Sequence, residues 1–162
     1  MLNPGFWKGK RVFLTGHTGF KGSWLCLWLH KLGAQVSGYS LPPLTNPSLF
    51  ELGRCGDTVT TTYGDVADRA ALEAAMQRAE PEIVIHMAAQ SLVRYSYANP
   101  VETFATNVLG TVHALDAMRR TPSIRAAVMV TSDKCYYNNE WVWGYRENER
   151  LGGHDPYSAS KA

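Results

Sequence analysis

The stretch that decides the fold is RVFLTGHTGFKG, residues 11–22. It opens with a short, mainly apolar run, and glycines follow at positions 16, 19 and 22. Residues 20–32 then carry apolar side chains at helical spacing, and Gly33 ends that pattern. We therefore predict a buried strand that passes through a glycine-rich turn into a helix.

Further strands and helices alternate along the rest of the chain. The pattern predicts strands over residues 35–39, 58–63, 82–88 and 126–131, a helical turn near 48–52, and helices over 68–79 and about 100–120. Strands that alternate with helices and are apolar on both faces are typical of a covered parallel sheet. We expect a doubly wound, Rossmann-type α/β fold, with residues 1–162 forming one dinucleotide-binding domain that lacks an internal boundary.

The composition excludes several classes of protein. The formal net charge is only +2, without a basic patch, so nucleic acid is not an expected partner. No apolar run is long enough to span a bilayer, and no signal peptide is recognisable. The three cysteines, Cys26, Cys55 and Cys135, are far apart and lack metal-ligand spacing, which favours the cytoplasm and no structural metal.

The glycine turn carries the first functional signal. Glycines at such a turn allow close backbone approach, and the free N–H groups of the following helix attract a pyrophosphate. A helix start that merely tolerates glycine is the alternative, but the position directly after a strand favours phosphate binding. The expected cofactor contacts here are Gly16, Gly19, Phe20, Lys21 and Gly22.

The spacing TGxxGFxG resembles the extended short-chain dehydrogenase/reductase family, and in particular its nucleotide-sugar dehydratases. That resemblance implies NAD as cofactor. The end of the second strand has neither the acidic residue typical of NAD enzymes nor an arginine that would favour NADP. NAD therefore rests on the resemblance, with Ser40 as a substitute contact to the ribose.

Other matches to the family lie after the later strands, where ligands of doubly wound sheets bind. Each has a plain structural alternative: a turn or helix cap for Asp65, core packing for the alanine pair, and a solvated helix face for Asn107. In the family the asparagine supports the catalytic lysine. The cofactor-site residues implied are Asp65, Val66, Ala88, Ala89, Gln90 and Asn107.

A Tyr-x-x-x-Lys pair, Tyr157 and Lys161, stands near a predicted helix start at Pro156. The two side chains are expected on one helix face. A nearby ammonium and a nicotinium charge favour the phenolate, so the tyrosine can act as a base at neutral pH. Such a pair is common on solvated helices, but combined with the glycine turn it predicts catalysis, and both residues are also expected to contact the cofactor.

The fifth strand is followed by Ser132, Asp133 and Lys134. In the family, the serine binds the reacting hydroxyl, and in 4,6-dehydratases the next two residues act as acid and base, usually as Asp-Glu. The Asp-Lys version resembles the CDP-glucose branch. It implies oxidation at C4, in which Tyr157 removes the hydroxyl proton while hydride passes to NAD, then loss of water across C5 and C6, and hydride return to C6. Lys134 would need a lowered pKa to act as the base, and a surface ion pair with Asp133 is the alternative.

The resemblance covers about half of a usual family member. We expect the sugar-binding lobe to be absent from this chain, the isolated polypeptide to be inactive and poorly stable, and the full-length protein to be a homo-oligomer acting on a nucleotide-activated hexose, with CDP-glucose favoured. Two alternatives stay open: another nucleotide-sugar enzyme such as a 4-epimerase, and a non-catalytic cofactor-binding module.

Overall fold

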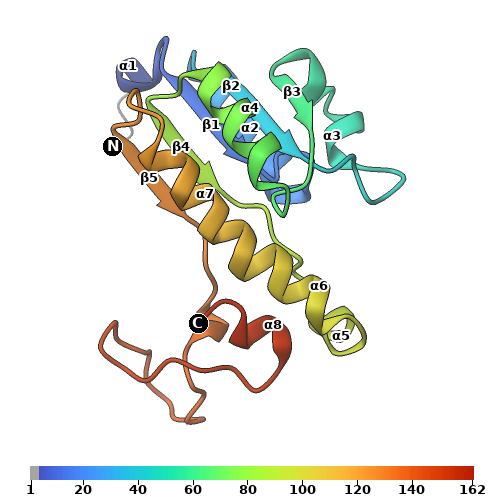
Figure 1. Ribbon diagram of the computed structural model, residues 1–162, viewed down its shortest axis with the longest axis vertical. Coiled ribbons are helices and arrows are strands. Elements are labelled where there is room, and N and C mark those ends of the chain that lie inside the picture. The colour runs from blue at the N-terminus through green and yellow to red at the C-terminus, as the bar shows by residue number, and fades with distance from the viewer. Residues whose placement is uncertain (1–3) are drawn as a thin grey trace.

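The computed structural model describes residues 4–162 and contains one five-stranded parallel sheet. Its strands lie in the order β3-β2-β1-β4-β5, as Figure 1 shows. Their bounds are β1 Arg11–Thr15, β2 Gln35–Ser40, β3 Thr60–Tyr63, β4 Ile83–His86 and β5 Ala126–Met129. The chain runs outward from β1 through β2 to β3, and then crosses to β4 and β5 on the other side of β1. This confirms the predicted Rossmann-type sheet.

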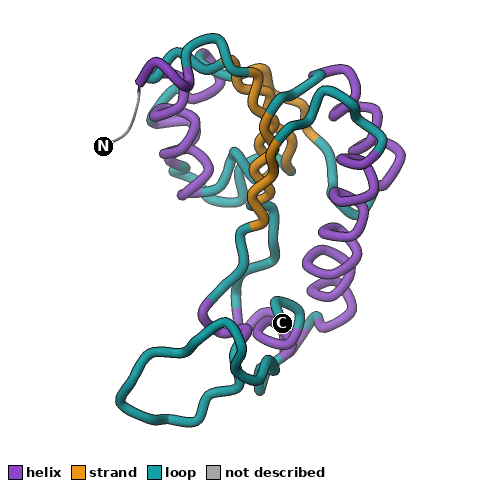
Figure 2. Tube along the Cα trace, turned by 90° about the vertical axis from the view of Figure 1, so that its left-hand side faces the viewer, coloured by secondary structure: helices purple, strands orange, loops and turns teal. Residues whose placement is uncertain are grey.

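Helices cover both faces of the sheet, which stands between them in Figure 2. The larger elements are α2 Phe20–Lys31, α4 Arg69–Ala79 and a long helical stretch made of α6 Pro100–Phe104, the π turn η2 Ala105–Leu109 and α7 Gly110–Arg119. Shorter ones are α1 Pro4–Trp7, α3 Leu49–Leu52, the 3₁₀ turn η1 Cys55–Asp57, α5 Val93–Ala98, the 3₁₀ turn η3 Asp133–Cys135 and α8 Pro156–Ala159.

Alternation along β1 produces two hydrophobic cores. Val12 and Leu14 face the core that packs against α2 and α3, and Phe13 faces the core that packs against α4 and α7. Since successive side chains of a strand point to opposite faces, one apolar run supplies both cores. The three side chains are at most 1% exposed.

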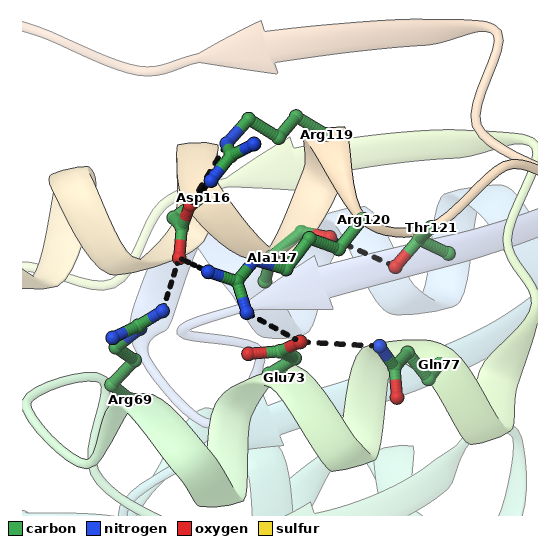
Figure 3. Close-up of polar contacts among 8 residues, drawn as sticks. All are labelled: Arg69, Glu73, Gln77, Asp116, Ala117, Arg119, Arg120 and Thr121. Atoms are coloured by element: carbon green, nitrogen blue, oxygen red, sulfur yellow. Dashed lines mark hydrogen bonds and ion pairs between the residues drawn. The ribbon is translucent and has the colours of Figure 1, made fainter.

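Ion pairs join α4 to α7 across the outer surface (Figure 3). Asp116 accepts from Arg69 on α4 at 2.8 Å, from Arg119 at 2.8 Å and from Arg120 at 3.3 Å. Arg120 also lies 3.6 Å from Glu73. These arginines hold the pKa of the Asp116 carboxyl below its usual range, with the hydrogen bond from Arg119 as the largest cause.

Most predicted elements are present, with shorter strands at both sheet edges and at β4. Asp68 caps α4 as expected, because its carboxylate accepts from the Ala71 N–H at 3.0 Å. The sequence did not predict α1, α5, η3 or the π turn. The π turn occurs where the Gly110 N–H donates to the Ala105 carbonyl, five residues back. In the described part of the chain, no helix has the length and apolar character needed to cross a membrane.

Candidate cofactor and catalytic site

The glycine turn joins β1 to α2 in a conformation that side chains would obstruct. Gly16 has φ 75°, and a Cβ on it would lie 2.8 Å from the Ala88 nitrogen. A Cβ on Gly22 would overlap the Gly16 carbonyl oxygen. Gly19 begins α2 without a side-chain cap. The first N–H groups of α2 are therefore available for an anion such as a pyrophosphate.

Two predicted cofactor residues, Phe20 and Lys21, occupy the first turn of α2. Both are exposed, Phe20 to 71%. Their position at the helix start agrees with the predicted phosphate site, while their contact with a cofactor stays a prediction.

Ser40, at the end of β2, is turned toward the glycine turn. Its hydroxyl is 9% exposed and lies 2.8 Å from the Thr18 hydroxyl. It also donates to the Leu41 carbonyl at 3.0 Å. The predicted ribose contact therefore shares its hydroxyl with Thr18, and direct binding of ribose stays a prediction.

His17 is a residue of the glycine turn that was not predicted to belong to the site. Its ring packs edge-on against Phe50 and fills the space left by Gly38, where a Cβ would overlap it. Nε2 lies 3.2 Å from the Thr61 hydroxyl. Burial lowers the pKa of His17 to about 4, so the ring is neutral at pH 7.

The end of β3 supplies Asp65 and Val66, which have structural roles here. The Asp65 carboxylate accepts from the Ala67 N–H at 2.9 Å, which closes a turn. Val66 is 3% exposed in the core beside α7, where Gly110 leaves room for it. Binding of adenine by this pair stays a prediction.

The segment after β4 approaches the glycine turn. The N–H groups of Met87 and Ala88 both donate to the Thr15 hydroxyl at 3.1 Å. Ala88, Ala89 and Gln90 are half-buried. The main chain of this loop passes so close to Gly16 that a Cβ there would lie 3.0 Å from Ala88 Cα.

Asn107 lies in the π turn and is 2% exposed, so it does not occupy a solvated helix face. Its side chain accepts from the Gln90 N–H and donates to the Gln90 carbonyl, both at 2.9 Å. It also donates to the Ser160 hydroxyl at 2.8 Å, which in turn donates to the Tyr157 carbonyl at 2.7 Å. Asn107 thus holds the residue next to Lys161; its support of the lysine itself stays a prediction.

The segment of Tyr157 is anchored at its start as well. The Tyr157 N–H donates to the hydroxyl of Ser96, a fully buried residue of α5, at 3.1 Å. Asp155 caps α8 by accepting from the Ser158 N–H at 2.9 Å. Ser96 was missed because α5 has no clear sequence signal, whereas Ser160 stood inside the quoted Tyr-x-x-x-Lys segment.

That Tyr157 and Lys161 share one helix face stays a prediction. Lys161 lies in the turn directly after α8, whose last helical residue is Ala159. Its ammonium donates to the carbonyl of Val130 at 3.4 Å, just past β5. Burial lowers the pKa of Lys161 below its usual range. The lysine therefore lies between the Tyr157 segment and the end of β5.

Ser132, Asp133 and Lys134 form the turn after β5, and this turn contacts α8. The Ser132 hydroxyl donates to the Asp133 carboxylate at 3.1 Å and accepts from the Lys134 N–H at 3.2 Å. Asp133 and Lys134 are both exposed, and no ion pair between them is found in the described structure. The structure thus brings the serine turn, the lysine and the tyrosine segment together.

The loop after this turn is rich in aromatic residues. Tyr136 stacks on Tyr145 with ring centroids 5.5 Å apart, and Trp141 packs against Tyr145 at 5.6 Å. The Gly152 N–H donates to the Cys135 carbonyl at 2.8 Å and closes the loop. This aromatic loop extends away from the sheet, below α8 in Figure 1.

Fold and site together define a Rossmann-type chain whose glycine-rich turn follows the first strand, with Lys161 and the Tyr157 segment close to the serine turn. The family model for GDP-mannose 4,6-dehydratase matches residues 13–162. The chain therefore belongs to this family of nucleotide-sugar short-chain dehydrogenases/reductases.

Individual relatives agree with this assignment. The chain is 58% identical over 161 residues to CDP-glucose 4,6-dehydratase from Salmonella typhimurium, which covers 99% of this chain and 45% of the relative. It is 34% identical to dTDP-glucose 4,6-dehydratase from Streptomyces antibioticus, over 93% of this chain and 45% of that protein. The chain thus spans about half the length of the curated relatives that it matches.

A solved structure has the same fold. UDP-glucose-4-epimerase from Stenotrophomonas maltophila, with bound NAD and formylated UDP-arabinopyranose, matches with a TM-score of 0.81 and 27% identity. The match covers 94% of this chain and 45% of the epimerase. The chain is therefore similar to the first half of a nucleotide-sugar enzyme in both sequence and structure.

Proposed function

We propose that this chain is the dinucleotide-binding part of an NAD-dependent, cytoplasmic CDP-glucose 4,6-dehydratase, a hydro-lyase that forms CDP-4-keto-6-deoxyglucose. The 58% identity to the Salmonella typhimurium enzyme, across nearly the whole chain, carries the proposal. The proximity of Lys161 and of the Tyr157 segment to the serine turn supports it. The sugar-binding part would lie in the remaining half of such an enzyme.

The residues present fit NAD. The uncapped start of α2 and the close approach of Gly16 to Ala88 provide backbone N–H groups and a flat surface for a pyrophosphate. When bound, NAD would accept the hydride from C4 of the sugar and later return it to C6. Gly16, Gly19, Gly22, Ala88 and Ala89 would hold it through their backbone.

Tyr157 would take the proton of the C4 hydroxyl as general base, while the Ser132 hydroxyl binds the same oxygen. The ammonium of Lys161 would stabilise the phenolate by its positive charge. The ketone at C4 acidifies the C5 proton, and Lys134 would remove it. Asp133, protonated at that step, would donate its proton to the departing C6 hydroxyl, which leaves as water.

The decisive experiment incubates the full-length protein with CDP-glucose and NAD and analyses the product. We expect a 4-keto sugar that has lost the C6 hydroxyl. A product that keeps that hydroxyl and differs only in configuration at C4 would indicate a 4-epimerase and overturn the proposal. Binding of NAD without any turnover would leave the non-catalytic cofactor-binding module.

Lys134→Ala tests the role of Lys134 as the base that removes the C5 proton. We expect this variant to retain C4 oxidation, seen as transient NADH absorbance, and to lose solvent deuterium incorporation at C5. Normal deuterium incorporation would remove Lys134 from the mechanism. Tyr157→Phe is the companion variant, since it should abolish the NADH signal itself while leaving NAD affinity within a few-fold of the wild type.

The proposal includes a homo-oligomeric full-length enzyme. Large apolar side chains on α6 and the π turn are exposed, among them Val101, Phe104 and Leu109. Exposed apolar surface of this kind supports association with a further copy or segment. Sedimentation of the full-length protein as a monomer at micromolar concentration would contradict it.

A further inference from the structure

Thr15 and His86 face each other at the carboxyl ends of β1 and β4, where they are register partners. Both are buried, with 0% and 2% exposure. The Thr15 hydroxyl lies 2.8 Å from His86 Nδ1. Neither residue belongs to the set of catalytic or cofactor contacts described above, although both lie between the glycine turn and the catalytic segment.

The directions of these hydrogen bonds determine the tautomer of the His86 ring. The Thr15 hydroxyl accepts from the Ala88 N–H and also from the Met87 N–H, which it shares with the Thr15 carbonyl at 3.2 Å. Its single proton must then be donated, and His86 Nδ1 is the acceptor in reach. Nδ1 therefore carries no proton, and a neutral ring carries its proton on Nε2.

The other side of the ring meets a matching acceptor. His86 Nε2 lies 3.5 Å from the Thr111 hydroxyl on α7. That hydroxyl donates its own proton to the Asn107 carbonyl at 2.6 Å, so toward the ring it can accept. One imidazole thus connects the strand end next to the glycine turn with the π turn.

Each end of this connection holds part of the candidate site. The Ala88 nitrogen, whose N–H is bound to Thr15, is the nearest atom that a Cβ on Gly16 would meet. Asn107 holds Gln90 and the hydroxyl of Ser160. A protonated ring would point an Nδ1–H at a Thr15 hydroxyl oxygen that already accepts from the Ala88 and Met87 N–H groups. Burial, and to a lesser extent the charge of Lys161, lower the pKa of His86 to about 4, which keeps the ring neutral.

We propose that His86 is a positioning residue whose neutral, Nε2-protonated ring sets the distance between the glycine turn that receives the cofactor and the π turn that holds the Tyr157 segment. The inference rests on the proposed function, because it assigns the two ends to cofactor binding and to catalysis. It adds Thr15, His86 and Thr111 to the residues on which the reaction depends.

Two substitutions of His86 in the full-length protein test its two hydrogen bonds separately. An asparagine side chain reaches only the Nδ1 position, so His86→Asn keeps an acceptor for Thr15 and loses the contact with Thr111. A glutamine reaches the Nε2 position, so His86→Gln keeps the donor and loses the acceptor. We expect His86→Gln to weaken NAD binding about tenfold, and His86→Asn to lower kcat about tenfold with NAD affinity within threefold, each matching one lost buried hydrogen bond.

Substitutions of Thr15 provide a test that does not require the His86 variants to fold. Thr15→Val should weaken NAD binding about tenfold, and Thr15→Ser should restore it to within threefold, because only the hydroxyl matters. The matched control is Thr121→Val, which also removes a buried hydroxyl, one that donates to the Ala117 carbonyl at 2.9 Å near the end of α7. It should leave NAD affinity unchanged.

The outcomes distinguish this inference from the proposed function. If the wild type binds NAD and turns over CDP-glucose, but both His86 variants match it or lose affinity and kcat equally, the positioning role is overturned. Equal loss of NAD affinity in Thr15→Val and Thr121→Val also overturns it, because the effect is then general destabilisation. A wild type that does not bind NAD defeats the proposed function instead. Nitrogen-15 spectra of labelled histidine should show His86 protonated at Nε2, and protonation at Nδ1 would overturn the inference.

Discussion

Gly22→Ala is expected to distort the glycine turn by steric overlap, without removing any polar group. A Cβ at this position would overlap the Gly16 carbonyl oxygen and lie 2.8 Å from His17 Cα. Carbon atoms in contact prefer about 3.5 to 4.0 Å. The obstacles are backbone atoms, so no flexible side chain can move aside, and either α2 or the turn must shift by more than about half an ångström.

The size of the effect follows from two opposing terms. Overpacking against fixed neighbours costs up to about 3 kcal/mol. Alanine is better than glycine in a helix by about 1 kcal/mol, which offsets part of that cost. The net loss is up to about 2 kcal/mol of unfolding free energy, or a fall in Tm of a few degrees. Displacement of the turn should also weaken NAD binding at least tenfold.

The assay is thermal unfolding of the full-length protein together with NAD titration. The control is Gly144→Ala, since a Cβ at Gly144 meets no atom within 4 Å and its φ is not in the left-handed region. That variant should match or slightly exceed the wild-type Tm. If Gly22→Ala and Gly144→Ala have the same Tm and the same NAD affinity, the turn tolerates a side chain and the reasoning is refuted.

Three further changes test other parts of the structure. Asp68→Ala removes the acceptor for the Ala71 N–H and should lower the unfolding free energy by about 1 kcal/mol in urea titrations; no change in the urea midpoint would contradict the cap. The pKa of His17 is about 4 in the folded chain, against about 6.5 when unfolded. Between these values only the unfolded chain gains the proton, so His17 should contribute a loss of about 3 kcal/mol of stability from pH 6.5 to 4, and His86, whose pKa is also about 4, a loss of similar size. His17→Gln should remove its own share of this loss, and the exposed His30→Gln should remove none. Asp116→Asn removes the charge shared by three arginines and should lower Tm at low salt, with a smaller effect at 1 M salt; a salt-independent difference would exclude the ion pairs as its cause.

The amino-acid sequence predicted the architecture well, because its signals are local. The apolar run at β1, the glycine spacing and the cap at Asp68 act within a few residues, and the observed β1 and α2 begin at the predicted positions. Parallel strands with right-handed crossovers then leave few arrangements of the sheet. Even the strands that proved shorter than expected, such as β4, lie at the predicted places along the chain.

Interactions between distant residues were not predictable in this way. The bond between Asn107 and Ser160 spans 53 positions, and the pair Thr15 and His86 spans 71. Their polar side chains stand in runs that predict only a strand or a helix, and nothing in the runs themselves indicates a partner. The helix α5, whose Ser96 anchors Tyr157, also gave no clear pattern.

The sequence by itself determined the fold class, the family and the types of residue available for chemistry, since these depend on periodicity and short motifs. The tertiary structure decided which of those residues act on one another. Only folding brings the ends of β1, β4 and β5 to a single edge of the sheet. There burial keeps the His86 ring neutral, and Lys161 lies beside the serine turn.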